Sequence, residues 1–237
     1  MPSTNPPSAP ARRGRKLAEI ETWIFDLDNT LYPASCNLFA EAEARMAAFI
    51  VAELKLELEA AHALRRRFFF DHGTTLRGLM LEHGIAPERF LDYVHDIDLS
   101  PVPPDPALAA AIAALPGRKF VFTNATEHYT RRVLARIGLT EHFAAVHDIL
   151  ACDYLPKPDP SGYRALLERH GIDPDRALMV EDVARNLLPA AALGMTTAWV
   201  VTGRERAAEG AGGDHVHHVV DALTPWLGTA LRETASG

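Results

Sequence analysis

The 237-residue chain has little cysteine, no long apolar run and no excess of basic residues. Its two cysteines, Cys36 and Cys152, are too few for a disulfide framework, so we expect reduced thiols in a cytoplasmic protein. The longest apolar runs, such as residues 107–115, fall far short of the roughly 20 residues that a membrane helix requires. We therefore expect no membrane partner.

The formal charge of −7, from 24 basic and 31 acidic residues, argues against a general nucleic-acid binder. The one basic cluster lies in a Pro/Ser-rich N-terminal segment and comprises Arg12, Arg13, Arg15 and Lys16. No apolar stretch follows it, as a secretory signal would require. We interpret residues 1–18 as a disordered, solvated tail in preference to a nucleic-acid contact.

Short apolar segments alternate with helical patterns in the second half of the chain. Strands are expected at residues 22–25, 119–122, 144–149, 177–180 and 196–201, with a weak last strand at 216–220. Because these strands are apolar on both faces, the sequence predicts a parallel sheet covered by helices. The fold class is therefore α/β, a Rossmann-like parallel sheet with helices on both faces.

A helical segment interrupts this pattern. Apolar residues recur at spacings near three and four between residues 38 and 70, and shorter helical stretches follow at 75–83 and 87–94. The Pro-rich connector 100–106 ends the segment. Since strand 22–25 is followed by no other strand until 119–122, we predict an inserted domain at 31–100 within a core domain of residues 19–30 and 101–237.

Polar side chains follow three of the expected strands where each strand ends. They are Asp26 and Asp28, Thr123 and Asn124, and Glu181 and Asp182. The carboxyl ends of parallel strands meet at one edge of the sheet, where ligands bind. A cation must offset the repulsion among these carboxylates. Mg²⁺ suits hard oxygen donors, and Lys157, in a Pro-flanked turn, is the second candidate.

Such a group of residues suits a phosphate ester. Asp26 would attack phosphorus as a nucleophile and form an aspartyl phosphate. Asp28 would protonate the leaving oxygen and then deprotonate the hydrolytic water. Lys157, Thr123 and the metal would stabilise charge on the equatorial oxygens.

These residues resemble the haloacid dehalogenase superfamily of phosphatases over about residues 20–227. Its four motifs occur in order, at residues 26–30, 123–124, 157 and 181–182. The resemblance implies that Asp26 is also a metal ligand, that Asp28 offers its backbone carbonyl to Mg²⁺, and that Asp182 completes the site. Glu181 would contribute through the metal or a bound water. Asn186 stands where the family usually has an acid, so it is either a ligand, a group that orients water or a structural hydrogen-bonder.

Dehalogenases of this superfamily lack the second aspartate and need no metal, so Asp28 indicates phosphate chemistry. The insertion at 31–100 matches the family's helical cap, which closes over the site. Residues 25–33, 73–79 and 96–99 are similar to the pyrimidine 5′-nucleotidase branch, although His72 stands where we expect tyrosine. This similarity implies pyrimidine nucleoside 5′-monophosphates, UMP or CMP, as substrates.

Two alternatives to this reading stay open. One is a phosphatase for another small metabolite, such as a sugar phosphate or phosphoglycolate, and the other is a non-catalytic phosphate- or nucleotide-binding protein. The second alternative is disfavoured because the motif residues Asp26, Asp28, Lys157 and Asp182 are all present. The residues expected to contact substrate are Asn124, Asn186, Tyr32, His72, Thr74 and Thr75. The sequence does not predict the oligomeric state.

Two further clusters are read as structural. His215, His217 and His218 are expected on a surface strand, with His215 and His217 on one face, in preference to a metal site. Residues 68–70, three phenylalanines, are expected in the core of the cap, with one ring free to face a bound base.

Overall fold

A computed structural model describes residues 14–235 of the chain. Six strands form one parallel sheet: β1 (Thr22–Phe25), β2 (Arg118–Phe122), β3 (Ala145–His147), β4 (Ala177–Glu181), β5 (Thr196–Val200) and β6 (His218–Val220). Their order is β3-β2-β1-β4-β5-β6, and every pairing is parallel. The predicted α/β class with a Rossmann-like sheet is confirmed.

Helices cover both faces of the sheet, as its apolar strands require. On one face α5 (Pro106–Ala114), α6 (Glu127–Ile137) and α9 (Leu223–Ala235) enclose a core that includes Phe25 and Val121. On the other face α7 (Pro160–His170) and α8 (Leu187–Ala192) enclose a second core that includes Ile24 and Phe122. Adjacent residues of β1 thus serve opposite cores, which is the two-residue period of a strand.

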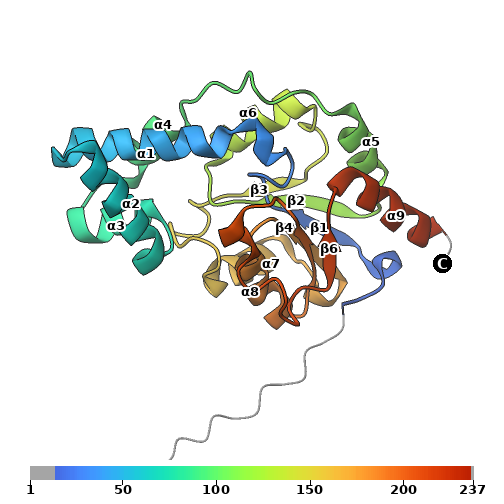
Figure 1. Cartoon of the computed structure of the whole chain (residues 1–237). Coiled ribbons are helices and arrows are strands. Elements are labelled where there is room, and N and C mark those ends of the chain that lie inside the picture. The colour runs from blue at the N-terminus through green and yellow to red at the C-terminus, as the bar shows by residue number, and fades with distance from the viewer. Residues whose placement is uncertain (1–13, 236–237) are drawn as a thin grey trace, which may run out of the picture.

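Four helices between β1 and β2 form a separate group on one side of the sheet (Figure 1). They are α1 (Leu38–Leu54), α2 (Leu58–His72), α3 (Thr75–His83) and α4 (Pro87–His95). These helices, which we call the cap, share an apolar cluster of their own that includes Phe49, Phe68 and Leu79. The continuous helical pattern expected over 38–70 is two helices, because the chain turns at Lys55, which has a φ of 55°.

Helices α2 and α3 approach closely at Gly78. A methyl group added there would lie 2.2 Å from Cγ of Phe68, whose side chain is fully buried. Glycine is therefore required by packing at this point and lets the two helices of the cap share one core.

One expectation at the N-terminal end of the chain needs adjustment. The tail was expected to reach residue 18, yet Leu17–Glu19 forms a 3₁₀ helix, and Leu17 and Ile20 are buried in the core. Residues 1–13 of that tail, including Arg12 and Arg13, lie outside the described residues. Among residues 14–235, no helix combines the length and apolar character that a membrane span requires.

The histidine cluster also differs from expectation. Strand β6 begins only at His218, so His215 and His217 lie before it and do not share a strand face. Nε2 of His215 lies 3.1 Å from the carbonyl of Ala184, and Nδ1 of His217 lies 3.0 Å from the amide of Thr197. These contacts support the structural reading of the histidines.

Candidate active site

Strand order explains why the motif residues meet. The chain leaves β1 toward β2 on one side and returns to β4 on the other, so the order of strands reverses between β1 and β4. Crevices of open parallel sheets form at the carboxyl ends of the strands at such a point. Asp26 directly follows β1, while Glu181 ends β4 and Asp182 follows it.

A buried ion cluster occupies this position. Nζ of Lys157 lies 2.7 Å from Oδ1 of Asp26 and 2.6 Å from Oε2 of Glu181, and it also donates to the carbonyl of Phe122 at 3.0 Å. All three charged residues are at least 95% buried. Two carboxylates and a backbone carbonyl thus share one ammonium group, which is enough to use its three donors.

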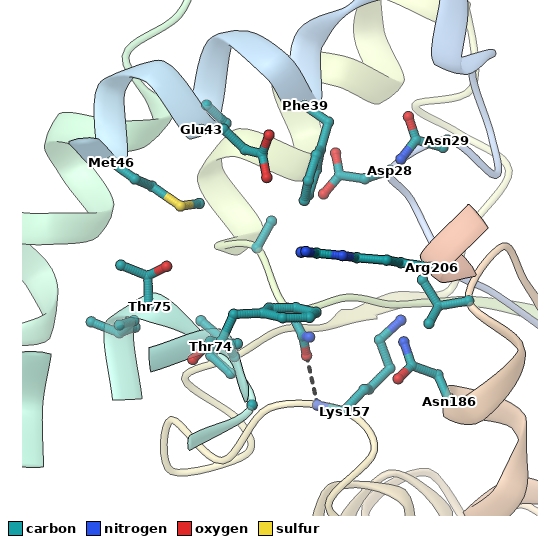
Figure 2. Close-up of a pocket in the computed structure, with 18 of the residues that line it drawn as sticks. Asp28, Asn29, Phe39, Glu43, Met46, Thr74, Thr75, Lys157, Asn186 and Arg206 are labelled. Atoms are coloured by element: carbon teal, nitrogen blue, oxygen red, sulfur yellow. Dashed lines mark hydrogen bonds between the residues drawn. The ribbon is translucent and has the colours of Figure 1, made fainter. Parts of the chain in front are cut away.

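The turn that carries Lys157 is held by the second motif. The backbone amide of Lys157 donates to Oδ1 of Asn124 at 2.8 Å, the bond drawn in Figure 2. Asp159 then caps α7 by accepting from the amide of Ser161. Asn124 therefore positions the lysine turn against the end of β2, in addition to lining the cavity.

The carboxylates also form a candidate metal site. One oxygen each from Asp26, Glu181 and Asp182 lies within 4.8 Å of the others. Oδ2 of Asp182 is buried and accepts no hydrogen bond from the described residues, and Nη1 of Arg204 lies 4.0 Å away, beyond hydrogen-bonding distance. An all-oxygen donor set with one unsatisfied carboxylate oxygen fits a hard divalent cation such as Mg²⁺.

The pKa values report the same shortage of positive charge. Burial and the charge of Glu181 raise the pKa of Asp26 to about 8, although Lys157 opposes the shift. Burial and Glu181 likewise raise the pKa of Asp182 to about 9. Although burial acts in the opposite direction, Asp26 and Glu181 raise the pKa of Lys157 and keep it cationic. A bound divalent cation would lower both carboxyl pKa values.

Asp28 has a different environment from Asp26. Its Oδ1 accepts hydrogen bonds from the hydroxyl of Tyr32 and, at 3.5 Å, from that of Tyr129. Burial raises the pKa of Asp28, and the two tyrosine hydroxyls and Lys157 oppose that shift. A carboxyl group with a raised pKa is suited to donate a proton.

The second tyrosine connects Asp28 to the end of the cap. The ring of His95, the last residue of α4, stacks on Tyr129 with centroids 4.6 Å apart and an interplanar angle of 17°. Arg132 of the same helix as Tyr129 donates to the carbonyls of His95 and Ile97. The carboxyl of Asp28 is therefore held by an element that also anchors the cap.

A cavity of about 240 Å³ lies between the cap and the ends of the strands. Figure 2 shows Phe39, Glu43 and Met46 projecting from α1 on one side and Lys157 and Asn186 on the opposite side. Most predicted site residues line it, namely Asp26, Asp28, Asn124, Lys157, Glu181, Asp182, Asn186, Thr74 and Thr75. The elements that supply them are far apart in sequence.

Three predicted site residues are not among those lining the cavity. Thr123 is 1% exposed, and its hydroxyl accepts from the amide of Ala125 at 3.0 Å. Tyr32 faces Asp28, so it contacts the predicted acid group. His72 points to Glu82 on α3, with Nε2 2.8 Å from the carboxylate, and this contact is a structural one within the cap.

Thr74 and Thr75 also have structural contacts. Thr74 is the N-cap of α3, where its hydroxyl accepts from the amide of Arg77 at 3.1 Å, and Thr75 is buried at the start of that helix. Asn186 is 93% buried, and its carbonyl accepts from the hydroxyl of Tyr163. Each of these residues lines the cavity and stabilises its own element.

Sequence reasoning missed Phe39 and the arginine residues of the cavity wall. Three arginines outside the cap place their guanidinium groups over phenylalanine rings of the cap. The distances from Cζ to the ring centroid are 4.7 Å for Arg185 and Phe69, 4.4 Å for Arg204 and Phe39, and 5.0 Å for Arg206 and Phe70. Of the three phenylalanines expected in the core of the cap, Phe68 is fully buried there, whereas Phe69 and Phe70 line the cavity and Phe70 is exposed. No spacing in the sequence indicated which arginines meet these rings.

Comparison with known proteins agrees with this geometry. A family model described as haloacid dehalogenase-like hydrolase matches residues 20–194. A phosphoglycolate phosphatase of Mesorhizobium japonicum is 30% identical over 190 residues, which cover 73% of this chain and 78% of the relative. A phosphoglycolate phosphatase of Neisseria gonorrhoeae is 26% identical and covers 79% of this chain and 82% of its own length.

Solved structures show the same fold at lower identity. A HAD phosphatase from Thermococcus onnurineus superimposes with a TM-score of 0.62 at 18% identity, over 89% of this chain and 97% of the other. A HAD family hydrolase from Deinococcus radiodurans, solved with bound phosphate and sodium, gives a TM-score of 0.56 at 21% identity over 92% and 97%. Motifs, strand order and sequence matches together place this chain in the haloacid dehalogenase-like hydrolase family, as a phosphatase of that family.

Proposed function

We propose that the protein is a Mg²⁺-dependent phosphomonoesterase that works through an aspartyl phosphate on Asp26. The observation that carries the proposal is the buried cluster of Asp26, Lys157, Glu181 and Asp182 at the end of β1 and β4. Its single ammonium group cannot balance three carboxylates. A cluster of this composition is suited to a divalent cation and a phosphoryl group bound together.

In the first step a carboxylate oxygen of Asp26 forms a bond to phosphorus while the bond from phosphorus to the ester oxygen breaks. Asp28 gives its proton to that leaving oxygen, and the alcohol departs. In the second step water attacks the aspartyl phosphate, Asp28 takes the water's proton, and inorganic phosphate leaves. Lys157 stabilises negative charge on the phosphoryl oxygens in both steps.

Asp26, Glu181 and Asp182 would hold the metal through their carboxylates, and Asp28 through its backbone carbonyl. The cation would supply Lewis-acid stabilisation of the phosphoryl group. The hydroxyls of Tyr32 and Tyr129 both donate to Oδ1 of Asp28, so they hold the side chain in place. The other carboxyl oxygen, Oδ2, would carry out the proton transfer. Asn186 lines the same cavity and would orient water or a ligand there.

The substrate we favour is a small phosphate monoester of the phosphoglycolate type. The cavity of about 240 Å³ is smaller than the roughly 300–1,000 Å³ typical of sites for drug-sized ligands. The relatives from Mesorhizobium and Neisseria bear the name phosphoglycolate phosphatase. Both observations support the small-metabolite alternative over the pyrimidine nucleotide.

A pyrimidine 5′-monophosphate remains the second candidate. The aromatic wall favours it, because Phe39, Phe69 and Phe70 line the cavity and a planar base stacks on such rings. Each of these rings already has an arginine guanidinium over it. A base would therefore have to use the opposite face of a ring or displace an arginine, which weakens this candidate.

The test is phosphate release from phosphoglycolate, UMP, CMP, AMP and a sugar phosphate. Each ester is assayed with Mg²⁺, with a chelator, and with the Asp26→Asn variant. We expect metal-dependent release of phosphate from phosphoglycolate. The rate of release should fall at least about 1,000-fold in Asp26→Asn because the nucleophile is gone. The unfolding transition of that variant should match that of the unaltered protein. Release concentrated on UMP and CMP would establish the second candidate, and full activity of Asp26→Asn would disprove the mechanism.

A further inference from the structure

Away from the carboxylate cluster, the wall of the cavity is cationic. Five arginines line it, whereas Glu43 and Glu209 are the acidic residues that line it outside the motifs. The arginines are Arg65, Arg66, Arg185, Arg204 and Arg206. In a chain of net charge −7, this concentration of positive charge lies in the same cavity as the carboxylate cluster.

The guanidinium group of Arg185 contacts an aromatic ring, and it has no hydrogen-bond acceptor among the described residues. Arg185 lies over the ring of Phe69, with its Cζ 4.7 Å from the ring centroid. A cation–π contact of this kind leaves the N–H groups of the guanidinium available to an acceptor. Within residues 14–235, the guanidinium of Arg185 makes no hydrogen bond or ion pair, and its Nε is buried.

A second arginine lies on the same face of α2 as that ring. Arg65 and Phe69 are four residues apart on the helix, so their side chains are neighbours. Nη1 of Arg65 is 2.6 Å from Oε1 of Glu43, but its buried Nε has no hydrogen-bond acceptor in the described part of the chain. Arg65 and Arg185 thus both line the cavity, and each has a buried Nε without an acceptor in the described part of the chain.

We propose that Arg185, assisted by Arg65, binds a carboxylate on the leaving group, so that the preferred substrates are phosphate monoesters of small hydroxy acids. The inference rests on the proposed phosphatase function and names the substrate class of the same site. A carboxylate matches the planar fork of a guanidinium group and would pair with the terminal N–H groups of Arg185, which have no acceptor among residues 14–235. In the proposed mechanism, Lys157 and the metal ligands bind the phosphoryl group. The carboxylate of the substrate is a second anionic group, and it therefore needs separate cationic residues to bind it.

The experiment compares 2-phosphoglycolate with its carboxamide, which has the same size but no charge at the leaving group. We expect kcat/KM of the unaltered protein to favour the acid by about 10- to 100-fold. Arg185→Gln should reduce this preference at least about tenfold, and Arg65→Gln should reduce it less because Glu43 already pairs with that side chain.

The matched control is Arg67→Gln. Arg67 lies on the same helix two residues from Arg65, but its guanidinium pairs with Glu82 on the surface of the cap. We expect the acid-over-amide preference to be unchanged in this variant. A fall as large as that of Arg185→Gln would show that the helix, not the carboxylate contact, controls the preference, and would overturn the proposal.

A binding measurement separates this inference from the proposed function. Calorimetric titration of Asp26→Asn with both compounds reports the preference without turnover. Tighter binding of the acid, lost in Asp26→Asn/Arg185→Gln, supports the carboxylate site even if no ester is hydrolysed. Equal binding of acid and amide overturns it even if phosphatase activity is present.

Discussion

Replacing Lys157 by methionine tests how the buried cluster is balanced. The substitution keeps the length of the side chain but removes an ammonium group that lies 2.7 Å from Asp26, 2.6 Å from Glu181 and 3.0 Å from the carbonyl of Phe122. Breaking a buried ion pair in this way leaves uncompensated charge and costs about 3–5 kcal/mol. That is a large share of the 5–15 kcal/mol by which domains are typically stable.

The loss should depend on pH in one direction. Burial already raises the pKa of Asp26 to about 8, and removing Lys157 takes away a charge that lowers it, so the pKa rises further. A carboxyl whose folded pKa exceeds its unfolded value near 4 stabilises the fold most below pH 4 and loses that contribution as pH rises through the folded value. The destabilisation of Lys157→Met is therefore expected to be smaller at pH 5 than at pH 8.

Urea unfolding followed by circular dichroism at pH 5 and pH 8, with and without Mg²⁺, measures these effects. Because a cation can replace the missing charge, Mg²⁺ should restore part of the stability at pH 8. Lys119→Met, on the neighbouring strand β2, is the control and should change stability by less than about 1 kcal/mol. The reasoning would be refuted by a loss below 1 kcal/mol at pH 8, or by a loss that grows at pH 5.

Two further substitutions test the acid group and the cap. Tyr32→Phe removes a hydrogen-bond donor to Asp28, so kcat/KM for an alkyl phosphate should fall about tenfold. The value of kcat/KM for an aryl phosphate should be nearly unchanged, because its leaving group needs little protonation. Equal losses on both esters would contradict the positioning role of Tyr32. Gly78→Ala places a methyl group 2.2 Å from the buried ring of Phe68 and should reduce the free energy of unfolding by about 1–3 kcal/mol. An unchanged denaturation midpoint in that variant would show that the cap helices separate without cost.

Sequence alone predicted the elements on which the site depends. Strand residues 22–25 and the positions of Asp26 and Asp182 follow from local chemistry, because short apolar segments and the polar residues that end them are adjacent in the chain. The convergence of the carboxylates follows from parallel pairing alone. The family match confirms the fold class that this reasoning reached.

Contacts between the cap and the core could not be predicted in the same way. Tyr129 reaches Asp28 across about 100 residues of sequence, and its position on α6 shows nothing unusual in the periodicity. The pairing of Arg185 with Phe69 depends on how the cap docks on the sheet, which no local pattern specifies. For His72, the sequence predicted a contact with substrate, but in the structure the side chain faces Glu82.

The placement of β1 in the middle of the sheet has a consequence for synthesis. Its partners are residues 118–121 on one side and 177–180 on the other, so neither exists when β1 is first made. The four helices of the cap carry most of their apolar cluster within residues 49–94 and are complete before either partner strand. Chains grow from the N-terminus at about 5–20 residues per second, so the nascent chain holds a strand that is fully buried in the folded protein, with two unpaired edges, for several seconds or more. That interval is when this protein is most exposed to aggregation and has most need of a chaperone, and it ends only when β4 is made and docks.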